Sequence, residues 1–406
     1  MPQAEYDAIV VGAGPSGSSC AALLARQRLR VLLIDKAQFP REKTCGDAIG
    51  GKALSVLSEL GLIENLRGVG FARSSGLIFS SPKGTSVEIP LADESEMVRG
   101  FVCKRKQFDS ILFSNAKKWC NVLESTEAVE LLFDQGRVIG VKAKGPGGCE
   151  REFFGKIVVG ADGASSLVAR KTGLLRLDPA HSCTAVRAYY KGVAGLKGNV
   201  EIHFLPECMP GYFWIFPLSE TEANVGVGML NCDISKSRVG LAGMISKCMA
   251  APRFVGRFEN AQMEGKIEGW VLPLASARRK CSGNGFVLIG DAASLIDPFS
   301  GEGIGNGMKS GKIAADVIGS ALLKRGNVSK QDCLLYENRL WEEIGADVGT
   351  SHMMQKLGKT SALLDLVVGK AKKSQWLRSE LGAMIANKEA KRKAVDPLFY
   401  LKVLLA

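Results

Sequence analysis

The sequence predicts an α/β fold: a Rossmann-like dinucleotide-binding domain carries an inserted antiparallel β-sheet domain and is followed by a C-terminal helical region. Three observations lead to this prediction. The N-terminus reads as strand, glycine turn, helix and second strand. Residues 181–275 read as alternating strands with one amphipathic helix near 238–249. The stretch 285–291 then reads as another buried strand that ends in an acidic residue.

The N-terminal unit has the spacing of a phosphate-binding turn. A mainly apolar run over residues 6–11, expected to be a buried strand, leads into Gly12, Gly14 and Gly17, and a second strand ends at Asp35. Gly12 permits the tight turn, Gly14 lets backbone approach a pyrophosphate, and Gly17 lets the helix pack closely on the strand. A carboxylate at the position of Asp35 can accept ribose hydroxyls. Strand, glycines, helix and acid in this order predict a dinucleotide site.

The domain boundaries follow from changes in pattern along the chain. We expect the dinucleotide-binding domain in two parts, residues 1–180 and 276–325, because residues 181–275 form the antiparallel-sheet substrate domain between them. Residues 326–406 are expected to be a helical region. With 406 residues, the chain is longer than one hydrophobic core usually supports.

Composition restricts the class of protein and partner. The 53 Lys and Arg against 41 Asp and Glu give a net charge of +12, which suits nucleic acid, an anionic lipid surface or an acidic cofactor. No arginine-rich tract or interleaved aromatic stripe accompanies that charge, so we expect no nucleic acid partner. Hydrophobic residues at 46% and charged residues at 23% are typical of a soluble globular enzyme.

Cysteine and histidine usage predicts no metal site. The 11 cysteines are scattered without a Cys-x-x-Cys pair, and there are only 3 histidines. Such thiols suit a reducing cytosol. The first apolar run leads directly into the glycine turn rather than into a cleavage site, and no window of 18 uninterrupted apolar residues could span a bilayer. We therefore expect a cytoplasmic location.

Aromatic residues alternate in one strand of the predicted substrate domain. Tyr212, Trp214 and Phe216 have period two and share one sheet face, and Gly226 and Gly228 do the same on the following strand. Aromatic side chains beside a strip without side chains would leave a flat apolar slot. Periodicity alone favours the plainer interpretation, an aromatic core stripe with glycines for close strand packing.

Three glycine signatures, at residues 12–17, 160–166 and 290–293, resemble those of the flavoprotein hydroxylase superfamily, which binds FAD. Within it, the chain is most similar to the geranylgeranyl reductase family. Four segments show the similarity over roughly residues 5–320: residues 40–46, residues 105–109, residues 212–217 with 226–228, and residues 290–293 with Pro298 and 301–304.

The resemblance implies an FAD-dependent oxidoreductase that reduces carbon–carbon double bonds of a geranylgeranyl-type or polyprenyl chain, on a prenyl lipid or prenylated quinone. The electron donor, NAD(P)H or ferredoxin, stays open. The aromatic wall with its two glycines is then interpreted as substrate-binding. The residues that the resemblance places at FAD are Gly12, Gly14, Ser16, Gly17, Asp35, Cys45, Gly46, Arg105, Ala128, Asp291, Gly303 and Ile304.

Three of these residues have chemistry of their own. Arg105 can neutralise a pyrophosphate or fix the loop beside it, or it is a solvated helix residue. Asp291 can accept a ligand hydroxyl, or it only caps its strand. Cys45 lies between Arg41 and Lys43, which would favour a thiolate; as a thiol, it is a candidate catalytic proton donor to the alkene, the alternative being a packing cysteine.

Alternatives and peripheral features complete the prediction. The runner-up activity is an FAD-dependent monooxygenase of an apolar or aromatic substrate, and a different class is a non-catalytic flavoprotein that binds lipid or a partner. Glycines at 301–307 should open a helix whose N-terminus faces the flavin. Basic residues at 388–393 precede an apolar run at 397–405, which predicts either a peripheral membrane contact or docking on the protein itself.

Overall fold

The nucleotide-binding sheet predicted from the sequence has six strands and is mainly parallel. The computed structural model describes residues 4–67, 72–73, 76–90, 100–237 and 239–386, with the isolated positions 396, 399 and 402. β1, the strand before the glycine turn, lies inside the sheet and pairs in parallel on both sides. The strands, in spatial order, are β18 (Ser282–Gly283), β19 (Phe286–Leu288), β12 (Val158–Gly160), β1 (Ala8–Val11), β2 (Val31–Ile34) and β8 (Asn121–Leu123).

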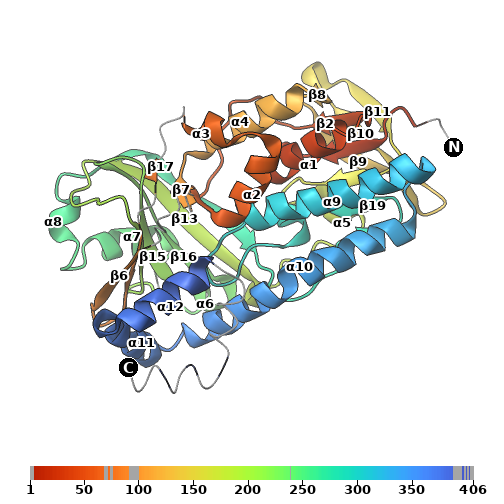
Figure 1. Cartoon of the computed structure of the whole chain (residues 1–406). Helices are drawn as coiled ribbons and strands as arrows, with labels where there is room; N and C mark the ends of the chain where they lie inside the picture. Colours follow the sequence, from red (N-terminus) through yellow and green to blue (C-terminus); the bar gives the residue numbers. More distant parts are fainter. Residues whose placement is uncertain are drawn as a thin grey trace.

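Helices from both ends of the chain pack around this sheet (Figure 1). α1 (Pro15–Ala25) packs against α9 (Ile304–Arg325), and α9 packs against α10 (Lys330–Leu357). The contact between α1 and α9 is close because a Cβ at Gly311 would lie only 2.7 Å from the backbone oxygen of Ser16. After residue 275 the chain contributes β18 and β19 to the first sheet and α9 to the helices that pack around it.

The second sheet has seven strands and forms the other half of the molecule. Most of its pairs are antiparallel, as expected for residues 181–275, with α7 (Leu241–Met249) packed against it. Two of its strands come from residues 76–90, and one of these pairs in parallel with β14. The strands, in spatial order, are β17 (Gln262–Pro273), β13 (Ser182–Lys191), β16 (Glu222–Leu230), β15 (Tyr212–Pro217), β14 (Val200–His203), β5 (Gly76–Ser80) and β6 (Ser86–Pro90).

Two small sheets and several short helices complete the two halves. The strands are β3 (Ala48–Gly50), β7 (Gly100–Val102) and β4 (Ala72–Arg73) in one sheet, and β11 (Glu150–Phe154), β10 (Arg137–Lys144) and β9 (Glu127–Asp134) in the other. The helices are α2 (Gly51–Leu60), α3 (Ile63–Arg67), α4 (Arg105–Lys117), α5 (Leu167–Lys171), α6 (Asn231–Ile234) and α8 (Val255–Phe258).

The C-terminal helices cover the edge of the second sheet. α10 runs from the first sheet toward α11 (Ser361–Lys373) and α12 (Gln375–Ala386), which both pack on β6 (Figure 1). Val87 and Ile89 of β6 share a small buried core with Val368 and Leu377 of these helices. Within the described ranges, none of the helices combines the length and the apolar character that a membrane crossing requires.

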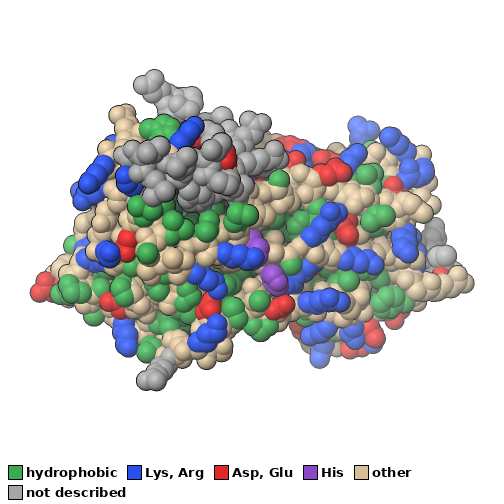
Figure 2. Space-filling model, turned by 90° about the horizontal axis from the view of Figure 1, so that it is seen from below, with side chains coloured by type: hydrophobic (Ala, Val, Ile, Leu, Met, Phe, Trp, Pro, Cys, Tyr) green, Lys and Arg blue, Asp and Glu red, His purple; other side chains and the backbone are tan. Residues whose placement is uncertain are grey.

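Charged side chains on the surface do not gather by sign on the face that Figure 2 shows. Lys and Arg side chains are spread over this face among acidic and apolar ones. A mixed surface of this kind does not form the continuous basic stripe that a nucleic acid backbone requires. On this face, the Lys and Arg side chains are therefore not concentrated in one patch.

Candidate active site

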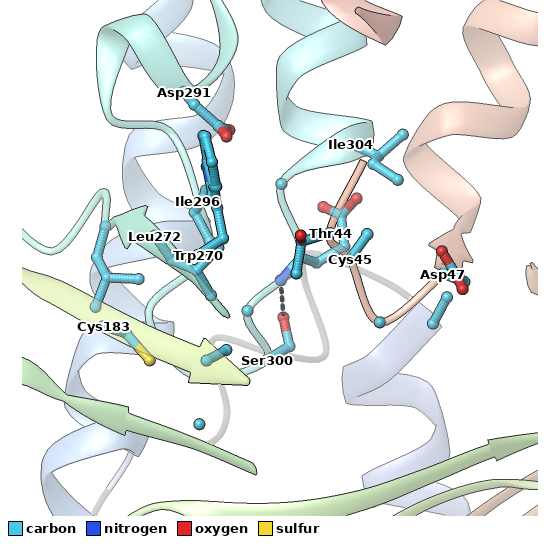
Figure 3. Close-up of a pocket in the computed structure, with 18 of the residues that line it drawn as sticks. Thr44, Cys45, Asp47, Cys183, Trp270, Leu272, Asp291, Ile296, Ser300 and Ile304 are labelled. Atoms are coloured by element: carbon cyan, nitrogen blue, oxygen red, sulfur yellow. Dashed lines mark hydrogen bonds between the residues drawn. The ribbon is translucent and has the colours of Figure 1, made fainter. Parts of the chain in front are cut away.

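A cavity of about 1300 Å³ connects the two halves of the molecule. One part is bounded by the turns that follow β1, β2 and β12, at the carboxyl ends of parallel strands, where nucleotides bind in open α/β sheets. The other part is bounded by the second sheet. The loop over residues 36–47 lies between them, and Figure 3 shows Thr44, Cys45 and Asp47 of this loop near Ile304.

Most residues predicted for the site line this one cavity. From the cofactor set these are Gly12, Gly14, Ser16, Asp35, Cys45, Gly46, Arg105, Ala128, Asp291, Gly303 and Ile304. From the substrate set these are Tyr212, Trp214, Phe216 and Gly228. Gly17 and Gly226 are not among the lining residues, and both allow close packing behind the cavity wall.

The surroundings of the three glycines of the first turn fit the three purposes that their spacing predicts. Gly12 has φ of +99°, and a Cβ there would lie 2.4 Å from the backbone oxygen of Ala161. A Cβ at Gly17 would lie only 1.8 Å from the oxygen of Gly12. At Gly14 the nearest atom to an added Cβ is the Arg41 Nη2 at 3.7 Å. Gly14 therefore faces open cavity, as a residue that admits a pyrophosphate must.

Asp35 supports this turn from the end of β2. Its Oδ2 accepts a hydrogen bond from the Ala13 N–H at 2.6 Å, and its Oδ1 accepts one from the Ala37 N–H at 2.8 Å. The carboxylate thus joins the glycine turn to the start of the 36–47 loop while it lines the cavity. An acid in this position fits the ribose-binding role proposed from the sequence.

Arg105 fixes the 36–47 loop, the second of the three roles considered for it. Its Nε and Nη2 donate to the two carboxylate oxygens of Asp109 at 2.7 and 2.8 Å, and Asp109 also pairs with Arg41 at 3.0 Å. The backbone N–H of Arg105 donates to the Asp47 Oδ1 at 3.3 Å. Because Arg105 is buried and its guanidinium is occupied by a buried carboxylate, it is not a solvated helix residue.

Cys45 is held as a thiol, which corrects the expectation that Arg41 and Lys43 favour a thiolate. Burial raises the pKa of Cys45, and this outweighs the positive charge of Arg105, which lowers the pKa. Arg41 is occupied with Asp109 and lies over the ring of Phe39. A protonated sulfur beside the cavity keeps the proton-donor role available.

Lys43 and Asp291 place opposite charges inside the cofactor part of the cavity. The Nζ of Lys43 lies 3.1 Å from the centre of the Trp270 ring, and Asp291 projects into the cavity on the side of Trp270 (Figure 3). Burial, followed by the charge of Arg105, lowers the pKa of Lys43 to about 7, and burial raises the pKa of Asp291. Lys43 therefore changes charge near neutral pH in the ligand-free protein.

This titration predicts that FAD affinity depends on pH. Below pH 7 Lys43 carries a positive charge that favours a pyrophosphate, whereas above pH 7 the ligand-free side chain is neutral and binding must take up a proton. We expect the affinity to fall by up to about tenfold per pH unit above pH 7. FAD fluorescence titrations between pH 6 and 8.5 measure this, and the Lys43→Met variant should have a flat profile. The same slope in both proteins would exclude Lys43 as the titrating group.

The positive potential at the N-terminus of α9 is reduced by an acidic side chain, which the sequence did not indicate. The helix begins at Ile304 after the glycine-rich stretch, as predicted, and Gly303 and Ile304 line the cavity. The buried carboxylate of Glu302 accepts the Gly305 N–H at 2.5 Å and offsets part of the helix dipole. A Cβ at Gly303 would lie 2.9 Å from the Cγ1 of Ile296, so a larger residue there would displace protein atoms as well as a cofactor.

The aromatic wall forms as its period predicts. The rings of Tyr212 and Phe216 lie 6.1 and 5.9 Å from that of Trp214. Trp214 pairs across the sheet with Gly226, where a Cβ would lie 2.3 Å from the indole, so Gly226 accommodates the ring and does not bound an open slot. Gly228 faces the cavity, and a Cβ there would have no neighbour nearer than 3.6 Å.

The cavity continues past this wall into an apolar region that the sequence did not indicate. Its boundary comes from β5, β6 and β14 of the second sheet and from the C-terminal helices, which have no recognisable motif. The lining residues here are Leu77, Phe79, Val87, Val200, Ile202, Phe204, Met354, Leu357, Leu363, Leu364, Val367 and Leu381. A long apolar ligand can therefore extend from the nucleotide turns to α11 and α12.

Sequence reasoning also missed two buried polar residues beside Cys45. Asp47 has φ of +68°, and burial raises its pKa to about 6. Asn224 is fully buried within β16 and donates to the backbone oxygen of Cys45 at 2.8 Å. An amide residue inside an otherwise apolar strand is the signal that could have identified Asn224, because Asn is depleted in strands.

Comparisons with known proteins agree with this geometry. Residues 5–328 match the family model described as FAD binding domain. Digeranylgeranylglycerophospholipid reductase 1 of Methanopyrus kandleri is 32% identical over 343 residues, which cover 84% of this chain and 86% of that protein. Menaquinone reductase of Mycobacterium tuberculosis is 33% identical over 329 residues, which cover 79% and 78%.

Solved structures agree on the fold. A geranylgeranyl bacteriochlorophyll reductase-like protein from Thermoplasma acidophilum superposes with a TM-score of 0.85 at 24% identity, over 98% of each chain. The flavin-dependent brominase Bmp2 superposes with a TM-score of 0.76 at 23% identity, also over 98% of each chain. The family match, the extended reductase relatives and the cavity at the glycine turns lead to one conclusion: the chain belongs to the geranylgeranyl reductase family of FAD-binding proteins.

Proposed function

We propose that this protein is an FAD-dependent oxidoreductase that reduces carbon–carbon double bonds of an isoprenoid chain on a prenyl lipid or prenylated quinone. The observation that supports it most is the single cavity, which runs from the nucleotide turns past an aromatic wall into an apolar region. Such a cavity accepts a dinucleotide at one end and a long apolar chain at the other. The names of the reductase relatives supply the same class of substrate.

The residues at the turns fit FAD. Gly14 leaves space for a pyrophosphate, Asp35 and Asp291 offer carboxylates to hydroxyl groups, and Lys43 offers a positive charge. When bound and reduced, FAD supplies the hydride for the double bond. The electron donor that reduces FAD, NAD(P)H or ferredoxin, stays open.

The remaining chemistry belongs to the chain. An isolated alkene has no carbonyl to store the charge of an added hydride, so an acid that delivers a proton is needed. The thiol of Cys45, kept protonated by burial, is suited to this role. The faces of Tyr212, Trp214 and Phe216 hold the chain, exclude water and stabilise positive charge that develops on a tertiary carbon.

Cys45→Ser separates the acid role from packing. FAD occupancy should stay at the wild-type level, while alkene reduction slows by about 10²- to 10⁴-fold, because a hydroxyl is a much weaker acid than a thiol. Anaerobic single-turnover rates of the reduced protein provide the measurement. Cys120→Ser is the control, since Cys120 bonds to the Ala116 oxygen away from the cavity. Wild-type turnover in Cys45→Ser would exclude the acid role.

An anaerobic assay against a panel of prenyl lipids tests the function itself. Reduced protein is mixed with geranylgeranyl lipids and prenylated quinones, and mass spectrometry follows the gain of two mass units per double bond. A monooxygenase would instead oxidise NAD(P)H rapidly in air and add oxygen to an apolar or aromatic substrate. A flavoprotein without catalytic function would leave every acceptor unchanged.

We also propose a cytoplasmic protein that contacts membranes peripherally to reach such substrates. Exposed Leu366 and Trp376 flank three lysines at the end of α11, a combination that suits an anionic lipid surface. The basic and apolar segments predicted to take part, residues 388–393 and 397–405, lie outside the described residues apart from the isolated positions 399 and 402. Salt-sensitive binding to anionic liposomes that is weakened by truncation after Asn387 would support the contact.

A further inference from the structure

A single buried amide joins the cofactor loop to the substrate wall. Asn224 lies in β16 opposite Phe216 and is fully buried. Its Oδ1 accepts a hydrogen bond from the Trp214 Nε1 at 3.0 Å. Its Nδ2 donates to the Cys45 oxygen and to the Asp47 Oδ2, both at 2.8 Å. The amide therefore uses both of its donor hydrogens and its acceptor on partners that belong to the site.

The Cys45–Asp47 turn that Asn224 contacts is also constrained by other groups. Asp47, with its positive φ, also accepts the hydroxyl of Tyr189 at 2.8 Å. Between Cys45 and Asp47, a Cβ at Gly46 would lie 3.1 Å from the Phe216 ring. The Cys45–Asp47 turn thus rests directly on the aromatic wall, and Asn224 is the group that ties turn and wall together through hydrogen bonds.

We propose that Asn224 is a positioning residue that fixes the Cys45–Asp47 turn relative to the indole of Trp214, and so sets how a double bond lies between them. This inference rests on the proposed isoprenoid reduction. The residue type supports it, because only an amide can accept from the indole while donating twice to two oxygen atoms. An aspartate in its place would direct a carboxylate at the carboxylate of Asp47 and the oxygen of Cys45.

The test compares Asn224→Ala, Trp214→Phe and the double variant. Trp214→Phe removes only the indole donor and keeps an aromatic ring. We expect Asn224→Ala to slow single-turnover alkene reduction by about 10²-fold, since misplacement of that order follows from a shift of about 1 Å. FAD affinity and prenyl KM should change by less than about threefold. The double variant should be no slower than Asn224→Ala alone, because residues that act as a unit are not additive.

A second measurement does not depend on turnover. Hydrogen exchange at residues 44–48 of the FAD-loaded protein should become faster in Asn224→Ala, because the turn loses two hydrogen bonds. Asn199→Ala is the matched control. Asn199 is also a buried amide, and it donates a hydrogen bond to Glu88 in β6, the edge strand of the same sheet.

The outcomes separate this proposal from the proposed function. If wild type reduces no prenyl acceptor but the exchange at 44–48 still responds to Asn224→Ala, the reductase function fails and the positioning of the turn stands. If Asn224→Ala reduces prenyl lipids and exchanges at 44–48 like wild type, the positioning role is wrong. Equal slowing by Asn199→Ala, or additive effects in the double variant, would also overturn it. Should Asn224→Ala not fold, slowed reduction in Trp214→Phe at unchanged KM supports the role, and a wild-type rate contradicts it.

Discussion

Gly14→Val should give a folded protein that has lost its flavin. The native φ of Gly14 is −66°, which valine adopts, and the one atom within 4 Å of an added Cβ is the Arg41 Nη2 at 3.7 Å, an ordinary contact distance. The branched side chain therefore occupies cavity rather than protein, at the place where a pyrophosphate approaches the backbone. Overpacking of about 1–3 kcal/mol would weaken FAD binding by about 5- to 150-fold. Absorbance of the purified protein and equilibrium titration with FAD measure the loss.

Gly17→Ala provides the contrast. A Cβ there would lie 1.8 Å from the Gly12 oxygen, so the helix must move away from the strand even without a cofactor. We expect this variant to lower the melting temperature of the FAD-free protein, whereas Gly14→Val should leave it unchanged. Full flavin occupancy in a folded Gly14→Val protein would show that the pyrophosphate does not approach this turn.

Local patterns predicted the parts of the fold that local physics determines. The strand of β1, the turn at Gly12 and the helix of α1 form one continuous segment, and each has its own conformational preference. Hydrophobic periodicity likewise predicted α7 and the aromatic face of β15. Each of these elements needs little information beyond its own 10 to 20 residues.

What the sequence did not reveal depends on contacts between distant segments. In sequence, β5 and β6 cannot be distinguished from other short strands. The pairing of β14 with β5 adds both strands to the second sheet, where β6 packs against α11 and α12. The state of Cys45 was mispredicted because neighbours in sequence, Arg41 and Lys43, are not its strongest influences in space. Burial and Arg105 dominate its pKa instead.

The substrate slot shows the same limit at the scale of one residue. Gly226 and Gly228 are equivalent by period, and both were predicted to bound the slot. The indole of Trp214 lies over Gly226, held by its hydrogen bond to Asn224, and so only Gly228 faces the cavity. The period-two pattern predicts on which face of the sheet Trp214 lies. Its rotamer, however, is fixed by the hydrogen bond to Asn224, ten residues away.

Gly228→Leu should strongly impair the reduction of long prenyl chains while FAD stays bound. A Cβ at Gly228 has ordinary contacts, 3.6 Å to Ala185 Cβ and to Cys183 Sγ, so the sheet tolerates it and the remaining atoms extend into the cavity. The steric cost then falls on the ligand. Overpacking of about 1–3 kcal/mol corresponds to about 5- to 150-fold weaker chain binding. Geranylgeranyl lipids should lose more than short prenyl acceptors do.

Gly256→Leu is the matched control, because it adds the same side chain where no atom lies within 4 Å and outside the cavity. Single-turnover reduction across a series of chain lengths, read by mass spectrometry, provides the comparison, with flavin absorbance confirming occupancy. A Gly228→Leu protein that reduces geranylgeranyl lipids at the wild-type rate would place the chain elsewhere. If the wild-type protein only adds oxygen to small aromatic compounds, the reductase proposal is wrong and the protein is a monooxygenase. The apolar part of the cavity then does not hold a prenyl chain.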